Sequence, residues 1–235
     1  MAEKKLSRKE LLREPDEFIT LSGQVLRYCR EHTRLVTLIC VIVVICVIGA
    51  GGFYTYQKQR KDQSHELFEA AYRNYHHLTL SSTPPKKEQL ESIFKQFDGI
   101  AKEYRSLLAG EMALLYSGHV LYKMKDFKGA LERYTKMKST RVAQSGLSSM
   151  LIYHIAMTYL ALKDYEQSKT LFEQLAQNTD SPYLREAYAS IAAIYEATDK
   201  KKEAVQAYRQ YLKMFPKAPD AAYVKARIAQ LTSSG

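Results

Sequence analysis

The sequence predicts an all-α protein, with one membrane-spanning helix near the N-terminus followed by an α-solenoid of about three to four helix pairs and a C-terminal capping helix. Two observations support this fold class. An apolar run of 22 residues, from 35 to 56, contains no charged side chain. Beyond it, small and large side chains recur in a common register, at offsets of 38 and then 36 residues. Such a recurrence is typical of stacked helical repeats.

Residues 35–56 are long enough to cross a bilayer as a helix. At about 1.5 Å per residue they reach roughly 33 Å, against a hydrocarbon core of about 30 Å. Their centre is rich in Val and Ile, which suit a strand in water, but in lipid a helix satisfies its own backbone hydrogen bonds. A buried core helix is the first alternative, and the length of the uninterrupted apolar run disfavours it. A cleaved signal peptide is the second, and it is disfavoured because the run is too long, starts late and precedes no clear cleavage site. We therefore expect an uncleaved signal anchor.

The segment before the span, residues 1–34, predicts the orientation. Three basic residues lie close to the span on each side, so the short-range count is a tie. The wider context decides, because residues 1–34 carry eight Lys or Arg, whereas residues 57–235 are long enough to be translocated largely regardless of charge. We expect a cytoplasmic tail and an outer domain at 57–235.

The tail itself contains the start of a helix. Pro15 is followed by Asp16 and Glu17, a combination that favours a helix N-terminus. Apolar side chains after it fall on one helical face. We expect a short amphipathic helix, which either lies on the inner leaflet, meets another protein or serves only to set the topology.

Residues 57–235 have the length of one soluble domain with a sizeable core. All three cysteines lie before them, at Cys29, Cys40 and Cys46. The outer domain therefore has neither a disulfide nor a thiol-based metal site. This absence suits an oxidising compartment.

The formal charge of +10 is concentrated in the outer domain, which carries +8 from 27 basic and 19 acidic residues. A basic patch between residues 121 and 142 supplies much of it, namely Lys123, Lys125, Lys128, Arg133, Lys136, Lys138 and Arg141. Beside a membrane such a patch suits anionic head groups or an acidic partner, and a solvated helix face is an equally good interpretation. Nucleic acid as a partner is disfavoured by the expected location.

The first helix of the outer domain is expected to continue from the membrane. Residues 53–80 contain neither Gly nor Pro, so nothing forces the helix to end at the bilayer surface. An apolar stripe continues along Leu67, Ala71, Tyr75 and Leu78. The run from Ser81 to Pro85 ends this helix, and a second helix is expected from about 86 to 108.

Four columns of residues share the repeat register. They are Gly118, Ala156 and Ala192; Leu121, Tyr159 and Tyr195; Ala130, Ser168 and Ala204; and Tyr134, Phe172 and Tyr208. Small residues allow two helices to cross closely, and a large residue beside them fills the remaining space. Each unit therefore predicts an antiparallel helix pair.

These units resemble tetratricopeptide repeats. The first contains Gly118-x-x-Leu121, Asp126-Phe127 and Ala130-x-x-x-Tyr134, and the second has Asp164-Tyr165 in the corresponding turn. The third departs from the pattern, with Lys200 and Lys201 at the turn. Residues 64–108 resemble a degenerate first unit, and a final helix from 220 to 231 is expected to cap the stack.

A short cytoplasmic tail, one anchor and a divergent tetratricopeptide domain outside are together similar to the bacterial ancillary subunits of the Sec translocon. This resemblance covers nearly the whole chain in layout. It implies a periplasmic domain on the inner membrane. The implied partners are proteins: the translocon, periplasmic chaperones or exported clients.

No motif in the sequence assembles a catalytic or metal site. His65-Glu66 lacks the second His of a zinc protease, and the adjacent His76 and His77 point to different helix faces. No phosphate-binding glycine loop or nucleophile elbow is present. We expect a protein that is not an enzyme and that uses no cofactor and no metal.

A binding surface is expected on the concave face, which the first helix of each pair lines. The residues expected there are Leu115, Tyr116, His119, Tyr153, His154, Met157, Ala189 and Ala193. Relatives that hold a C-terminal carboxylate have Lys and Asn where this chain has Leu115 and His119, so that clamp is not expected. A surface of Met, Tyr and Leu suits apolar peptides or a partner helix, and the alternative is that part of it belongs to the core.

The function predicted is a membrane-anchored protein-binding scaffold that assists export or periplasmic folding beside the translocon. The alternative is a structural tether that links the inner membrane to an envelope assembly through one fixed partner.

Overall fold

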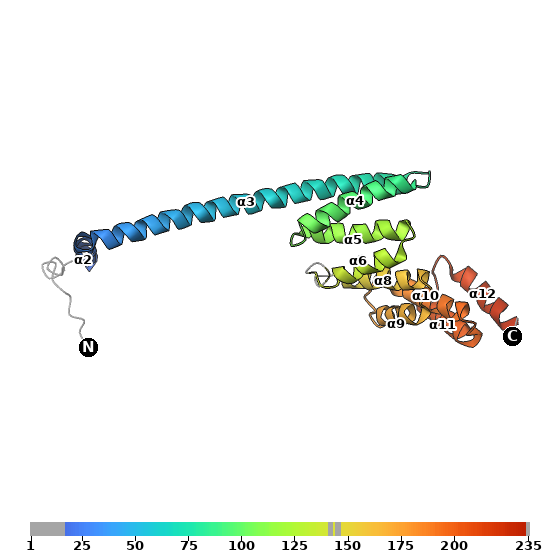
Figure 1. The fold of residues 1–235 in the computed structure, drawn as a ribbon. Coiled ribbons are helices and arrows are strands. Elements are labelled where there is room, and N and C mark those ends of the chain that lie inside the picture. Colours follow the sequence, from blue (N-terminus) through green and yellow to red (C-terminus); the bar gives the residue numbers. More distant parts are fainter. Residues whose placement is uncertain (1–16, 141–142, 144–146, 234–235) are drawn as a thin grey trace, which may run out of the picture. The chain divides into compact units, whose positions relative to one another are not determined.

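The computed structural model describes residues 17–140, 143 and 147–233, and within them every regular element is an α-helix (Figure 1). The chain divides into two compact units, Met1–Arg60 and Lys61–Gly235. The helices are α2 (Glu17–Glu31), α3 (Thr33–Leu80), α4 (Lys87–Glu103), α5 (Leu108–Lys123), α6 (Phe127–Met137), α8 (Ser148–Ala161), α9 (Tyr165–Ala176), α10 (Leu184–Ala197), α11 (Lys201–Met214) and α12 (Ala221–Ser233). The all-α prediction is confirmed.

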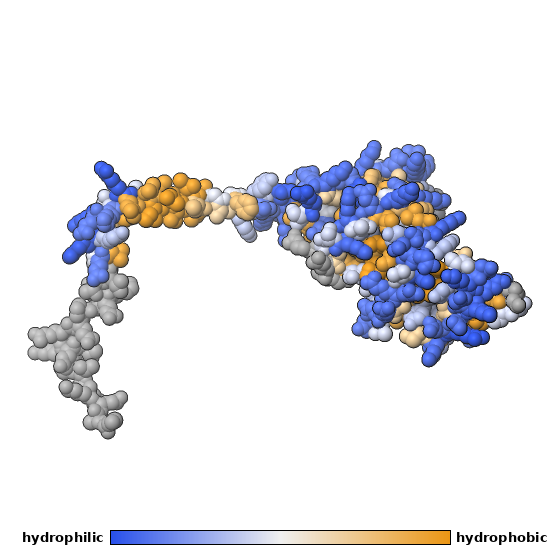
Figure 2. All heavy atoms as spheres, turned by 60° about the horizontal axis from the view of Figure 1, so that its bottom comes forward, coloured by the Kyte–Doolittle hydropathy of each residue, from blue (hydrophilic) through white to orange (hydrophobic). Residues whose placement is uncertain are grey.

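The first unit contains α2 and the N-terminal part of α3. Among the described residues, α3 is the one helix long and apolar enough to cross a membrane by length and composition, and none of its most apolar window is buried. Figure 2 shows these apolar side chains gathered in one band along the helix. In water such a band would leave a large apolar area exposed, which soluble proteins avoid. This helix is therefore compatible with a single membrane span.

The C-terminal part of α3 belongs to the second unit and packs there as its first helix. Phe68 and Ala71 are buried against α4, where the rings of Phe68 and Phe97 lie 6.0 Å apart. The expected apolar stripe is correct at Ala71 but wrong at Leu67, which is 42% exposed. The buried face runs through Ser64, Phe68 and Ala71 instead, because α4 meets the helix one position further along its circumference.

The repeat columns form the core of the following helix pairs, α5–α6, α8–α9 and α10–α11. Ala130, Ser168 and Ala204 are fully buried at the crossings, and Tyr134, Phe172 and Tyr208 are buried beside them. At the middle crossing the Ser168 hydroxyl donates to the carbonyl oxygen of Ala156 across 2.9 Å. The predicted register therefore describes the packing of all three pairs.

The three turns within these pairs also share one backbone conformation. Lys125, Lys163 and Asp199 have positive φ angles of 63°, 63° and 57°, and they stand at the same offsets of 38 and 36 residues. The residue after each is the N-cap of the second helix. Asp126 and Asp164 accept hydrogen bonds from the N–H groups of Gly129 and Gln167, at 3.0 and 3.2 Å. Lys200 makes no such bond.

The last helix, α12, covers the end of the stack as expected. Val224 and Leu231 are buried against the preceding pair. Arg227 forms an ion pair with Glu196 of α10, and Glu196 also accepts a hydrogen bond from the Tyr208 hydroxyl at 3.1 Å. One carboxylate thus joins α10, α11 and α12.

Candidate functional site

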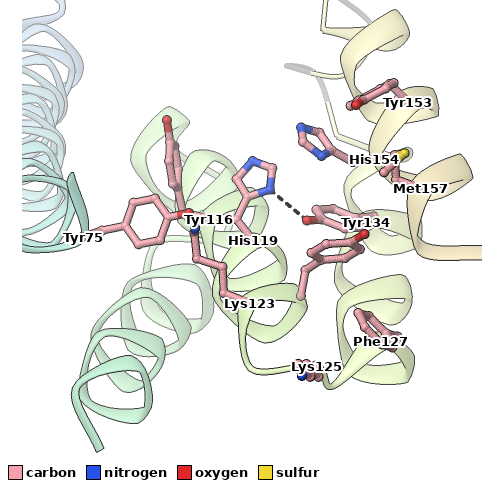
Figure 3. A pocket seen from close by; sticks show the side chains of 11 residues that line it. Tyr75, Tyr116, His119, Lys123, Lys125, Phe127, Tyr134, Tyr153, His154 and Met157 are labelled. Atoms are coloured by element: carbon pink, nitrogen blue, oxygen red, sulfur yellow. Dashed lines mark hydrogen bonds between the residues drawn. The ribbon is translucent and has the colours of Figure 1, made fainter. Parts of the chain in front are cut away.

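The second compact unit, Lys61–Gly235, is called the repeat unit from here on. It contains an open pocket of about 670 Å³ between four helices (Figure 3). Its lining consists mainly of rings: Tyr75 of α3; Tyr116, His119, Tyr122 and Lys123 of α5; Lys125 of the following turn; Phe127 and Tyr134 of α6; and Tyr153, His154 and Met157 of α8. Ligand pockets commonly combine an apolar aromatic lining with a few convergent polar groups. This pocket has both features.

A cluster of His119, Tyr134 and His154 forms one wall. The Nδ1 atom of His119 and the Tyr134 hydroxyl are hydrogen-bonded at 2.8 Å, the dashed line in Figure 3. The two imidazole rings lie 4.3 Å apart between centroids, and the ring of His154 is stacked on Tyr134 at 5.6 Å. The close approach of α6 depends on Gly118, because a Cβ there would lie 2.7 Å from the Tyr134 ring.

Burial keeps the interior of the pocket uncharged at neutral pH. Burial, with smaller contributions from His154 and Lys123, lowers the pKa of His119 to about 3, and burial lowers the pKa of His154 to about 4. Burial, with a smaller contribution from Tyr72, raises the pKa values of Tyr75 and Tyr116 to about 12. The histidines are therefore neutral and the phenols protonated.

A second wall is built around Tyr116. Its ring contacts Tyr75 at 5.7 Å, in an edge arrangement, and Phe97 at 5.4 Å, in a stacked one. Tyr75 comes from α3 and points toward Tyr116 in Figure 3. Such aromatic pairs contribute about 0.5–1.5 kcal/mol beyond the area that they bury. Ring contacts therefore join α3, α4 and α5 in this wall.

The sequence profile of a tetratricopeptide repeat-like domain matches residues 27–233. The chain belongs to the tetratricopeptide repeat-like family. No curated protein matches it.

Solved tetratricopeptide structures share the fold at low identity. A tetratricopeptide repeat protein from Parabacteroides merdae is 17% identical with a TM-score of 0.57, and the alignment covers 74% of this chain and 61% of that one. MamA from Desulfovibrio magneticus RS-1 is 14% identical with a TM-score of 0.53, and the alignment covers 74% of this chain and 97% of that one. These likenesses concern the fold alone.

Five of the eight residues expected on the concave face of the tetratricopeptide domain line the pocket: Tyr116, His119, Tyr153, His154 and Met157. Leu115 does not, because it is buried in the core, with only 2% of its surface exposed. It lies one turn before Gly118 on the face that packs against α6. Ala189 and Ala193 lie on α10, half-buried and exposed respectively, outside the pocket lining.

The side chains of the predicted basic patch do not form one surface. Lys123 and Lys125 line the pocket, and Lys128 and Lys138 are exposed outside it. Arg133 is paired with Asp98 of α4 at 2.7 Å and lies over the Phe94 ring. Lys136 pairs with Glu132 at 2.6 Å, and Arg141 lies outside the described residues.

Four lining residues were not predicted as site residues: Tyr75, Tyr122, Phe127 and Tyr134. Tyr134 was assigned to packing by its repeat column, and its ring is buried, but its hydroxyl is hydrogen-bonded to His119 on the pocket wall. Tyr75 belongs to residues 64–108, which resemble a degenerate first repeat. No repeat column includes Tyr75, so the direction of its side chain was not predicted. No group of three His, Cys, Asp or Glu able to hold a metal ion occurs among the residues that the structure describes.

Proposed function

We propose that this protein is a membrane-anchored scaffold whose tetratricopeptide pocket holds a segment of a partner protein. The observation that carries this proposal is the open pocket of about 670 Å³, whose lining is dominated by aromatic rings. A preformed aromatic wall binds an apolar side chain at little cost, because its own side chains are already ordered. Met157 adds an adaptable contact.

We place the protein in the bacterial inner membrane, with α3 as the span, residues 1–34 in the cytoplasm and the repeats in the periplasm. The excess of basic residues in the short tail supports this orientation. The resemblance in layout to ancillary subunits of the Sec translocon supports a role in export or periplasmic folding. The partners would then be the translocon, a periplasmic chaperone or exported clients.

Site-specific photocrosslinking in the native membrane tests the binding site. A benzoylphenylalanine residue is placed at Met157, which lines the pocket, or at Met214, which is 46% exposed on α11 outside it. We expect crosslinked protein adducts from position 157 and few from position 214. Equal adducts from both positions, or none from 157, would contradict the proposed site.

The identity of the adducts separates two kinds of scaffold. A range of exported proteins, or a translocon subunit, would support a role beside the export channel. One abundant envelope protein, captured to the exclusion of others, would instead support a fixed structural tether. Mass spectrometry of the adducts distinguishes the two.

A further inference from the structure

The charges around the pocket have a single sign. Lys123 and Lys125 contribute ammonium groups, and no Asp or Glu is among the lining residues that the structure describes. The remaining polar groups are phenol hydroxyls and two imidazole rings. Because the phenols stay protonated and the imidazoles neutral at pH 7, the pocket offers cations and hydrogen-bond donors but no anion.

Two acidic groups close to this part of the fold, Asp98 and Asp126, already have other partners. Asp98 of α4 holds Lys102 and Arg133, at 2.6 and 2.7 Å. Asp126 caps the N-terminus of α6. Lys123 and Lys125 are both exposed, so their ammonium groups are accessible to a carboxylate that arrives with a ligand.

We propose that the occupant of this pocket is a peptide segment in which an aromatic or large aliphatic side chain lies within a few residues of an Asp or Glu. This inference rests on the proposed function. The apolar side chain lies between the Tyr116 wall and Met157, and the carboxylates meet Lys123 and Lys125 at the C-terminal end of α5.

The two parts of the ligand contribute differently. Burial of a Phe or Leu side chain supplies most of the affinity, since each is worth about 1.5–3 kcal/mol when fully buried. Exposed ion pairs contribute less, about 0.2–1 kcal/mol each, and salt screens them. The lysines therefore select among apolar segments rather than provide the binding itself.

Fluorescence anisotropy with three labelled peptides tests the selection on the full chain in detergent. Each short acetylated peptide contains one Phe followed by two identical residues, either Glu, Gln or Lys. Two double variants are compared, Lys123→Gln with Lys125→Gln, and Lys128→Gln with Lys163→Gln. The second is a matched control, because it removes the same charge, and Lys163 occupies the same left-handed turn position in the next repeat, outside the pocket lining.

We expect the Glu peptide to bind wild type about fivefold more tightly than the Gln peptide at low salt, with the Lys peptide weakest. The preference should disappear in the Lys123 and Lys125 variant and persist in the control variant. Equal binding of all three peptides to wild type, or the same loss in both variants, would overturn this inference while leaving the proposed function standing. Absence of binding by every peptide would overturn both.

Discussion

Single residues in this chain have roles that their type alone does not suggest. Gly118 is buried and faces the ring of Tyr134. Its lack of a side chain allows α5 and α6 to approach closely, and its backbone flexibility is not what the site requires. His119 and His154 are neutral components of a wall rather than surface bases. In each case the neighbouring helix decides the role.

Replacement of Gly118 by Ala should destabilise the repeat unit. Alanine normally stabilises a helix interior by about 1 kcal/mol over glycine, but here the new methyl group would press on a ring held by its hydrogen bond to His119. Overpacking typically costs about 1–3 kcal/mol. Thermal melts should therefore show a lower Tm for Gly118→Ala. Gly99→Ala is the control, since Gly99 is exposed with open space around it, and it should leave the Tm unchanged or raise it.

The buried histidines should make the fold sensitive to mild acid. Their pKa values in the folded chain, about 3 and about 4, lie below the ordinary value of 6.5. The unfolded state therefore binds more protons below pH 6.5, and stability falls as the pH is lowered from there. Between pH 7 and pH 5 the loss is on the order of 1–2 kcal/mol for each histidine.

Melts of wild type and of His154→Gln across this pH window measure the effect. The variant should lose less stability between pH 7 and pH 5 than wild type does. Parallel profiles for the two proteins would show that His154 titrates normally and is not buried as described.

At the scale of elements, the repeats are regular in their turns and uneven in their caps. All three turns place a residue in the same left-handed conformation, with φ near 60°. Two of the following N-caps are Asp, whose side chain bonds a free N–H of the next helix, whereas the third is Lys200. The backbone of Lys200, at φ −87° and ψ 66°, is close to that of Asp164, at −83° and 77°. The third repeat thus has the geometry of a cap without the capping group.

Lys200→Asp should stabilise the repeat unit by about 1 kcal/mol, the usual value of an N-cap. The new carboxylate would also interact favourably with the N-terminus of α11. The gain would raise the Tm by about 2–4 °C for a unit of this size. Lys200→Ala removes the same positive charge without supplying an acceptor and should give little gain. Equal increases for both variants would assign the effect to charge rather than to capping.

The sequence predicts where helices lie and cross better than it predicts which side of each helix is buried. Columns such as Ala130, Ser168 and Ala204 identified the crossings correctly, because close packing there tolerates only small side chains. Leu67 and Leu115 were placed on the wrong faces, since a shift of one position around a helix exchanges a buried for an exposed residue. The pocket depends on Tyr75 and Tyr134, which reach it from helices outside the predicted concave row. Their convergence is a property of the stack and is absent from any one repeat.

At the scale of the whole molecule, α3 is shared between the two compact units. Its N-terminal part is apolar and exposed, as a span requires. Its C-terminal part contributes Phe68 and Ala71 to the repeat core. The repeat unit is therefore incomplete without residues that belong to the same helix as the candidate span.

Truncation distinguishes these two parts. A fragment of residues 61–235 retains Phe68 and Ala71 and should fold in water without detergent. A fragment of residues 81–235 exposes Phe97 and one side of Tyr116, and should be less stable by at least about 3 kcal/mol, since burial of each large apolar side chain contributes about 1.5–3 kcal/mol. Circular dichroism melts compare the two fragments. Equal melting temperatures would show that α3 is dispensable for the repeats.

The proposed orientation is tested with reporters fused after Gly235. A reporter active only outside the cytoplasm should be active there, and one active only inside should be silent. The reason is that a long domain follows a short basic tail and a single span. The opposite pattern of activities would reverse the topology and remove the basis for a role in export.

The contribution of Tyr75 to the pocket creates a thermodynamic linkage. A ligand that touches this ring favours the state in which the C-terminal part of α3 is packed on α4 and α5. By reciprocity, whatever favours that packed state strengthens binding of the ligand by the same factor. A load on α3 from the bilayer or from a membrane partner, if it loosens this packing, would weaken the pocket's hold on its occupant. In the membrane-anchored protein that we propose, release would then be controlled from the membrane, without any effector entering the pocket.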